Sequence, residues 1–158
     1  MPISPAENAF RKGKTALSDG KPKEAMILFE SAIHLQRDRN PAQPRMIFLS
    51  YFGLSTALAD RATPHAIQAC EMAAKQEFFN AELQLNLGKV YLLADKTTKA
   101  LGAFEHGLRL APRNRALRIE MNRVERRKRP PIPWMRRNHP VNCWLGKMRA
   151  SLVPRPAR

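Results

Sequence analysis

The chain has 158 residues, 44% of them hydrophobic, which is the size and composition of a single globular domain and excludes wholesale disorder. It carries 28 Lys and Arg against 13 Asp and Glu, a net charge of +15; residues 1–112 hold 14 basic and 11 acidic residues, whereas residues 113–158 hold 14 and 2. No long apolar run occurs and the N-terminal MPISPAENAF does not resemble an export signal, so we expect a cytoplasmic protein without a membrane span.

The first predicted element is a helical hairpin over residues 6–39. Small residues recur at helical spacing on both sides of a turn at Asp19–Gly20, and Phe29 lies among them, in the stretch AFRKGKTALSDGKPKEAMILFESAIHL. The small residues are Gly13, Ala16, Ala25 and Ala32. In two antiparallel helices, small residues permit close approach while an aromatic ring fills the space beside them.

A weaker copy of this pattern follows over residues 46–80. Its members are Leu49, Phe52, Gly53, Ala66, Cys70 and Ala73, with a turn at ADRATP. The spacing from Gly13 to Gly53 is 40 residues, against 35 from Gly53 to Gly88. The segment RDRNPAQP, residues 37–44, is therefore predicted to be a lengthened connection.

A third copy, over residues 81–114, is the clearest. It contains Gln84, Leu87, Gly88, Tyr91, Ala100, Phe104 and Pro112, with its turn at Asp95, Lys96 and Thr97. This spacing resembles the tetratricopeptide repeat pattern without its leading Trp, and the resemblance covers about residues 6–112. A generic helical bundle also has apolar residues at helical spacing, but it gives no reason for Gly and Ala to recur with a period of about 34 residues.

A capping helix is predicted after the third copy, over residues 115–128. There Leu117, Met121 and Val124 form a narrow apolar stripe among charged residues, as the last unit of a repeat array requires. The expected fold is an all-α, right-handed superhelical solenoid of three helical hairpins and a capping helix in residues 1–128. A Pro-rich basic tail follows over residues 129–158.

The resemblance implies a concave groove lined by the first helix of each repeat, where related proteins bind extended peptides. Carried over to this sequence, the lining residues are Phe10, Lys14, Leu17, Ser50, Tyr51, Leu54, Leu58, Leu85, Asn86, Lys89 and Leu92. The same residues also fit a packing role in the interior.

Some chaperone-binding members of that family hold a peptide C-terminal carboxylate with a clamp of Lys, Asn and Arg. Here Phe10 and Tyr51 stand where the clamp has Lys and Asn, and Leu85 replaces another Lys. We therefore expect an apolar or amphipathic ligand, contacted by Phe10, Tyr51, Leu54 and Leu85.

The tail combines proline, arginine and tryptophan. Prolines 130, 131 and 133 predict an extended connector, and a stripe at residues 141, 144, 145, 148 and 152 predicts a short amphipathic helix over residues 140–152. Its expected docking residues are Trp134, Arg136, Arg137, Trp144, Leu145 and Met148. Three destinations fit: packing on the repeats, a nucleic acid, or an anionic membrane surface or another protein, including a second copy of the chain.

Catalytic and metal-binding patterns are missing from the sequence. The histidines at 34, 65, 106 and 139 are scattered, Cys70 and Cys143 lie far apart, and no Gly-rich phosphate loop or nucleophile motif occurs. We therefore expect a non-catalytic scaffold or adaptor, without metal or cofactor, that binds a partner peptide or helix in the groove. The alternative is a nucleic-acid-binding protein that uses the tail.

Overall fold

The computed structural model describes residues 4–39, 45–61 and 63–128. Residues 40–44 of the predicted lengthened connection lie outside them, as do the tail helix over 140–152 and all six predicted docking residues of the tail. The described ranges form α-helices and contain no strand. These helices are α1 (Pro5–Ser18), α2 (Pro22–Arg39), α3 (Met46–Asp60), α4 (Pro64–Gln76), α5 (Ala81–Leu93), α6 (Thr97–Leu110) and α7 (Arg115–Lys128).

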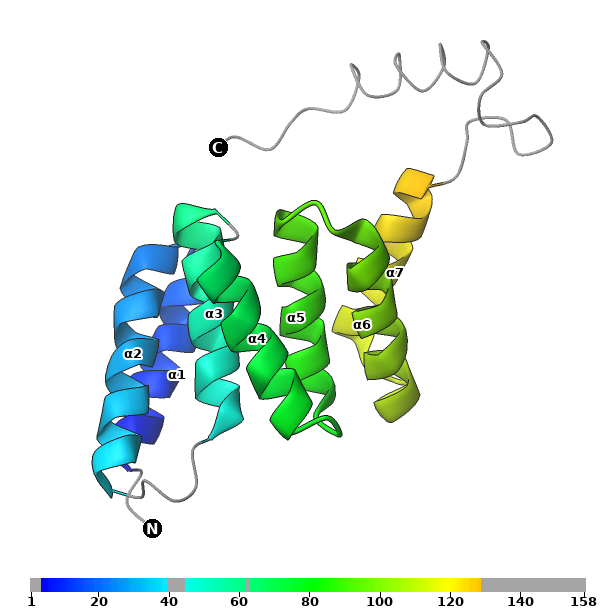
Figure 1. Ribbon diagram of the computed structural model, residues 1–158. Helices are drawn as coiled ribbons and strands as arrows, with labels where there is room; N and C mark the ends of the chain where they lie inside the picture. Colours follow the sequence, from blue (N-terminus) through cyan, green and yellow to red (C-terminus); the bar gives the residue numbers. More distant parts are fainter. Residues whose placement is uncertain (1–3, 40–44, 62, 129–158) are drawn as a thin grey trace, which may run out of the picture. The chain divides into compact units, whose positions relative to one another are not determined.

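The first six helices pair into three antiparallel hairpins that follow one another in chain order. Helix α1 packs on α2, α3 on α4, and α5 on α6, and neighbouring hairpins are joined through α2 with α3 and through α5 with both α3 and α4 (Figure 1). This arrangement confirms the predicted all-α helical-repeat solenoid. Residues up to Met121, within α7, belong to one compact unit.

The glycine of each hairpin lies where the two helices touch. A Cβ atom at Gly88 would lie 2.2 Å from the ring of Phe104, and one at Gly13 would lie 2.6 Å from the ring of Phe29. Both rings are fully buried. Glycine is therefore required at these two positions because no side chain fits beneath the ring.

The middle hairpin has a thiol where the others have a phenyl ring. A Cβ at Gly53 would lie 2.8 Å from Cys70 Sγ and 2.8 Å from the carbonyl oxygen of Ala66. The thiol of Cys70 donates a hydrogen bond to the carbonyl oxygen of Ser50 at 3.3 Å. Burial raises the pKa of this thiol to about 12, so it is an uncharged packing group at neutral pH.

Capping side chains determine where several helices begin. The hydroxyls of Ser4 and Thr63 each accept a hydrogen bond from the backbone N–H three residues later, at 3.2 and 3.3 Å. The side-chain oxygens of Asn80 and Asn114 accept one from the N–H two residues later, at 3.1 and 3.0 Å. Each side chain satisfies a donor that the first turn of a helix leaves unpaired, which fixes the starts of α1, α4, α5 and α7.

Two of the hairpin turns close in the same way. Gly20 and Asp95 follow α1 and α5 with φ angles of 75° and 58°, in the left-handed region. In both turns the next N–H donates to the carbonyl five residues earlier, at 2.9 and 2.8 Å. Asp is one of the few residues other than Gly that adopts this conformation at small cost, which explains why both residues end a helix here.

Candidate binding site

The predicted groove residues come from α1, α3 and α5, the first helices of successive hairpins. On each helix, residues spaced by three, four, seven or eleven positions share one side. The members of this surface that are exposed or half-buried are Lys14, Leu17, Tyr51, Leu58, Glu82, Lys89, Leu92 and Leu93, and we call it the α1/α3/α5 face.

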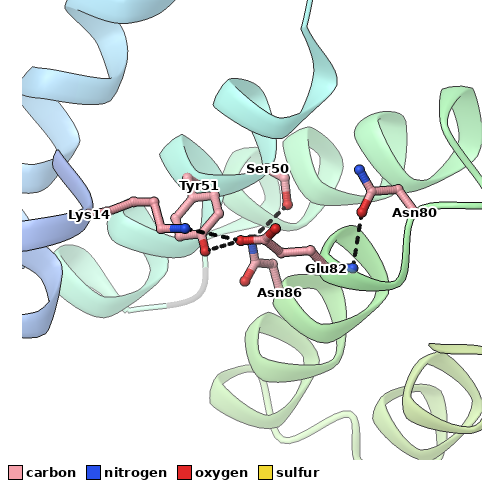
Figure 2. Close-up of polar contacts among 6 residues, drawn as sticks. All are labelled: Lys14, Ser50, Tyr51, Asn80, Glu82 and Asn86. Atoms are coloured by element: carbon pink, nitrogen blue, oxygen red, sulfur yellow. Dashed lines mark hydrogen bonds and ion pairs between the residues drawn. The ribbon is translucent and has the colours of Figure 1, made fainter. Parts of the chain in front are cut away.

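A polar network links the three helices on this face. Oε1 of Glu82 accepts a hydrogen bond from the Tyr51 hydroxyl at 2.5 Å and lies 3.5 Å from Nζ of Lys14 (Figure 2). The Lys14 ammonium also lies 5.3 Å from the centre of the Tyr51 ring. Lys14 and Glu82 keep 47% and 41% of their side chains exposed, so their ion pair contributes little stability and its charges stay open to a ligand.

A second polar pair lies beneath the first and is closed to solvent. The Asn86 side-chain amide donates a hydrogen bond to the Ser50 hydroxyl at 3.2 Å, and the two residues are 2% and 0% exposed (Figure 2). Since Cys70 binds the Ser50 carbonyl from α4, this point ties α3, α4 and α5 together. Both predicted groove residues here hold neighbouring helices at a fixed distance and are covered in this structure.

Three of the four side chains expected to contact a ligand also lie in the interior. Phe10, Leu54 and Leu85 are 7%, 4% and 8% exposed. The ring of Phe10 packs within 5.5 Å, centre to centre, of the rings of Phe29, Phe48 and Tyr51. Of the four, Tyr51 alone is half-buried and not fully buried.

Two accessible residues of the α1/α3/α5 face were not among the predicted ones. Glu82 lies four residues before Asn86 on α5, and Leu93 lies four residues after Lys89. Leu93 is 43% exposed at the end of α5, and Leu58 is 45% exposed near the end of α3. The helical spacing that selected Asn86 and Lys89 points to both missed residues, so the sequence contained the signal for them.

Both tyrosines of the chain are expected to ionise well above pH 10. Burial raises the pKa of Tyr51, and its hydrogen bond to Glu82 and the charge of that carboxylate raise it further. Burial likewise raises the pKa of Tyr91. Its 2.5 Å hydrogen bond to Glu71 and the charge of that carboxylate raise the pKa further. A titration of phenolate absorbance should show this rise in the folded chain and ionisation near pH 10 in denaturant.

The same shifts predict how stability depends on pH. The folded-state pKa of each tyrosine lies above the unfolded value of 10. The protonated tyrosine therefore adds to the free energy of unfolding, and this added stability is fully present below pH 10. It is lost as the pH rises through the folded-state pKa. The variant Tyr51→Phe should remove one of the two phenolate transitions, and identical titrations of folded and denatured chain would contradict the assignment.

Within the residues that the structure describes, no group of three or more His, Cys, Asp or Glu side chains could hold a metal ion. None of the described helices is both long and apolar enough to cross a membrane.

No family model and no curated protein matches this sequence. Solved structures match its fold. Among solved structures, the first TPR domain of human RPAP3 has a TM-score of 0.62 at 17% identity, covering 79% of this chain and 93% of that one. The Sgt2 TPR domain from Aspergillus fumigatus has a TM-score of 0.63 at 15% identity, covering 99% and 90%. The first TPR domain of Spaghetti (RPAP3), bound to the HSP90 peptide SRMEEVD, has a TM-score of 0.59 at 17% identity, covering 80% and 94%.

Proposed function

We propose that this chain, which has the tetratricopeptide repeat fold, is a non-catalytic cytoplasmic adaptor that binds a partner protein through its α1/α3/α5 face. The observation that carries the proposal is the composition of that face. Exposed charges at Lys14 and Glu82 lie beside the Tyr51 hydroxyl, and exposed leucines lie toward the ends of α3 and α5. Polar groups that fix orientation beside apolar side chains that can be buried are typical of a peptide-binding surface.

The fold supports a peptide or helix as the partner. The Spaghetti domain, which has a similar fold, is solved with a peptide of HSP90 bound to it. At this level of sequence identity the likeness shows the fold alone, so the chemistry of the partner has to come from the side chains of this chain.

Those side chains favour an amphipathic ligand over a free carboxylate. Glu82 places a negative charge 3.5 Å from the Lys14 ammonium, so part of the positive field that would attract a carboxylate is already compensated. Leu58 and Leu93, each more than two-fifths exposed, offer apolar area at the ends of neighbouring helices. The partner that fits is a peptide or helix with two or more large apolar side chains.

The double variant Leu58→Glu and Leu93→Glu should strongly weaken partner binding. Each new carboxylate would have to leave water when the partner covers it, so capture from a cell extract should fall at least about tenfold. Folding should survive, because surface substitutions change stability by only about 0.5 kcal/mol. Capture by the full chain, with and without nuclease, is the measurement.

The matched control is Ile27→Glu, which places the same charge at a 61% exposed apolar residue of α2 and should leave capture unchanged. Capture that persists in the double variant would contradict the site. Capture that disappears with nuclease would support the alternative, a nucleic-acid-binding protein.

A defined peptide separates the two ligand classes. The peptide SRMEEVD, which the Spaghetti domain binds, should bind this chain weakly, and amidation of its C-terminus should make no measurable difference. Fluorescence polarisation of the labelled peptide measures both. Tight binding that depends on the free carboxylate would show that the ligand is carboxylate-terminated after all.

A further inference from the structure

Two phenylalanines project from the turn between α4 and α5. Phe78 is 47% exposed and Phe79 is 75% exposed. The two rings lie against each other, with centres 3.8 Å apart and planes at 37°. Together they form an apolar knob on the surface, where exposed apolar area is gathered in one place and not scattered.

Hydrogen bonds hold this turn in place on both sides. Glu77 Oε1 accepts a hydrogen bond from the backbone N–H of Met46 at 3.2 Å, and Asn80 donates its side-chain amide to the other Glu77 oxygen at 3.3 Å. Asn80 also donates its backbone N–H to the Glu77 carbonyl at 3.0 Å and caps α5. These hydrogen bonds fix both ends of the turn whose two rings are exposed.

The edge that carries the knob is positively charged. The ends of α2, α4 and α6 lie at the same edge, the lower one in Figure 1, together with the starts of α3 and α5. Lys75, in the last turn of α4, Arg113, between α6 and α7, and Arg115, the first residue of α7, are exposed there. Arg118 is also exposed, and its guanidinium donates to the Arg113 carbonyl at 3.3 Å.

The nearby acidic groups cancel only part of this charge. Glu77 keeps its negative charge, because the Met46 N–H and the Asn80 amide are neutral donors, and it offsets one of the four cations. Glu7 pairs with Arg45, which removes one charge of each sign from the edge. The edge that carries the apolar knob therefore keeps an excess of positive charge.

We propose that this edge docks on an anionic membrane surface, with Phe78 and Phe79 entering the interfacial region and Lys75, Arg113 and Arg115 contacting lipid headgroups. Aromatic side chains gain free energy by leaving water at the interface, and basic residues gain from the negative potential of anionic lipids. Neither effect requires a spanning helix. This proposal uses residues outside the α1/α3/α5 face, so it stands or falls independently of the proposed function.

Two other occupants fit the edge less well. A second copy of the chain would bring the same cations against each other, which opposes association. A single-stranded nucleic acid needs an open ring face for each base, whereas Phe78 and Phe79 already cover part of each other's faces.

The test is co-sedimentation of the full chain with vesicles of phosphatidylcholine alone and with about 30 mol% phosphatidylserine added. The chain should bind the anionic vesicles, and binding should weaken with salt. Phe78→Ser with Phe79→Ser should lower the partition coefficient at least about tenfold, because two phenyl rings no longer leave water. A second variant, Lys75→Glu with Arg113→Glu, should lower it comparably with both rings intact.

The matched control is Ile27→Ser, which removes a 61% exposed apolar side chain from α2 and should leave vesicle binding unchanged. Circular dichroism checks that each variant is folded. Equal binding to both vesicle types overturns the proposal. Unchanged vesicle binding by the double Phe variant also overturns it, because the basic tail alone would then account for the binding. If the double Phe variant keeps vesicle binding but no longer binds an oligonucleotide, the knob contacts a nucleic acid. If it keeps vesicle binding but no longer forms a dimer, the knob contacts a second copy of the chain.

Discussion

The variant Gly88→Ala should lower the free energy of unfolding by about 3 kcal/mol, an effect set by one close contact. The new Cβ would lie 2.2, 2.6 and 2.7 Å from three carbon atoms of the Phe104 ring, which is fully buried and has no free space to enter. Alanine gains about 1 kcal/mol over glycine in helix propensity, and overpacking outweighs that gain. Thermal unfolding should show a midpoint lowered by about 10 °C.

Gly102 provides the matched control on the neighbouring helix. It lies within α6 and a Cβ there would meet nothing within 4 Å. Gly102→Ala should therefore raise the free energy of unfolding by up to about 1 kcal/mol. Adding Phe104→Leu to Gly88→Ala should restore part of the lost stability, because a smaller side chain leaves space for the new methyl group. If both alanine variants have the same stability, the close contact does not set the helix separation.

Phe10→Ala should cost about 3–4 kcal/mol of the free energy of unfolding, which identifies Phe10 as a core residue of the first two hairpins. The ring lies 4.7 Å from that of Phe48, 5.2 Å from that of Tyr51 and 5.5 Å from that of Phe29, all centre to centre. Truncation leaves a cavity bordered by three rings on α2 and α3, and those helices cannot close it without moving. Chemical denaturation of the full chain measures the loss.

Leu58→Ala serves as the comparison for Phe10→Ala. Leu58 was predicted for the same groove as Phe10. Unlike Phe10 it is 45% exposed, so its truncation should change the free energy of unfolding by about 0.5 kcal/mol or less. The two variants should therefore separate by several kcal/mol. If Phe10→Ala is as stable as the unsubstituted chain but fails to bind a partner, Phe10 is a ligand contact and the packing assignment is wrong.

The repeat architecture could be predicted from sequence because it depends on contacts within each hairpin. Gly88 and Phe104 are sixteen residues apart, and Gly13 and Phe29 have the same separation, so one local contact appears twice at the same spacing. The structure shows both contacts. Sequence patterns report such within-hairpin packing well, since the two partners are close along the chain.

Which residues of the α1/α3/α5 face are exposed could not be predicted in the same way. Whether Phe10 lines a surface or fills the interior depends on Phe48 and Tyr51, which belong to the next hairpin. How two hairpins pack against each other is decided by side chains from several helices, and spacing along one helix does not contain that information. The residues of the tail lie outside the described ranges, so their roles stay predictions.

The buried thiol of Cys70 makes the opening of the middle hairpin measurable in time. A thiol at 0% exposure with a pKa of about 12 presents almost no thiolate to a reagent while the chain is folded. Modification of Cys70 must then wait for α4 to separate from α3, and at high reagent concentration its rate equals the rate of that separation. Mass spectrometry of the peptide containing Cys70 would follow this rate. It would also show whether a ligand on the α1/α3/α5 face slows the separation of α3 and α4.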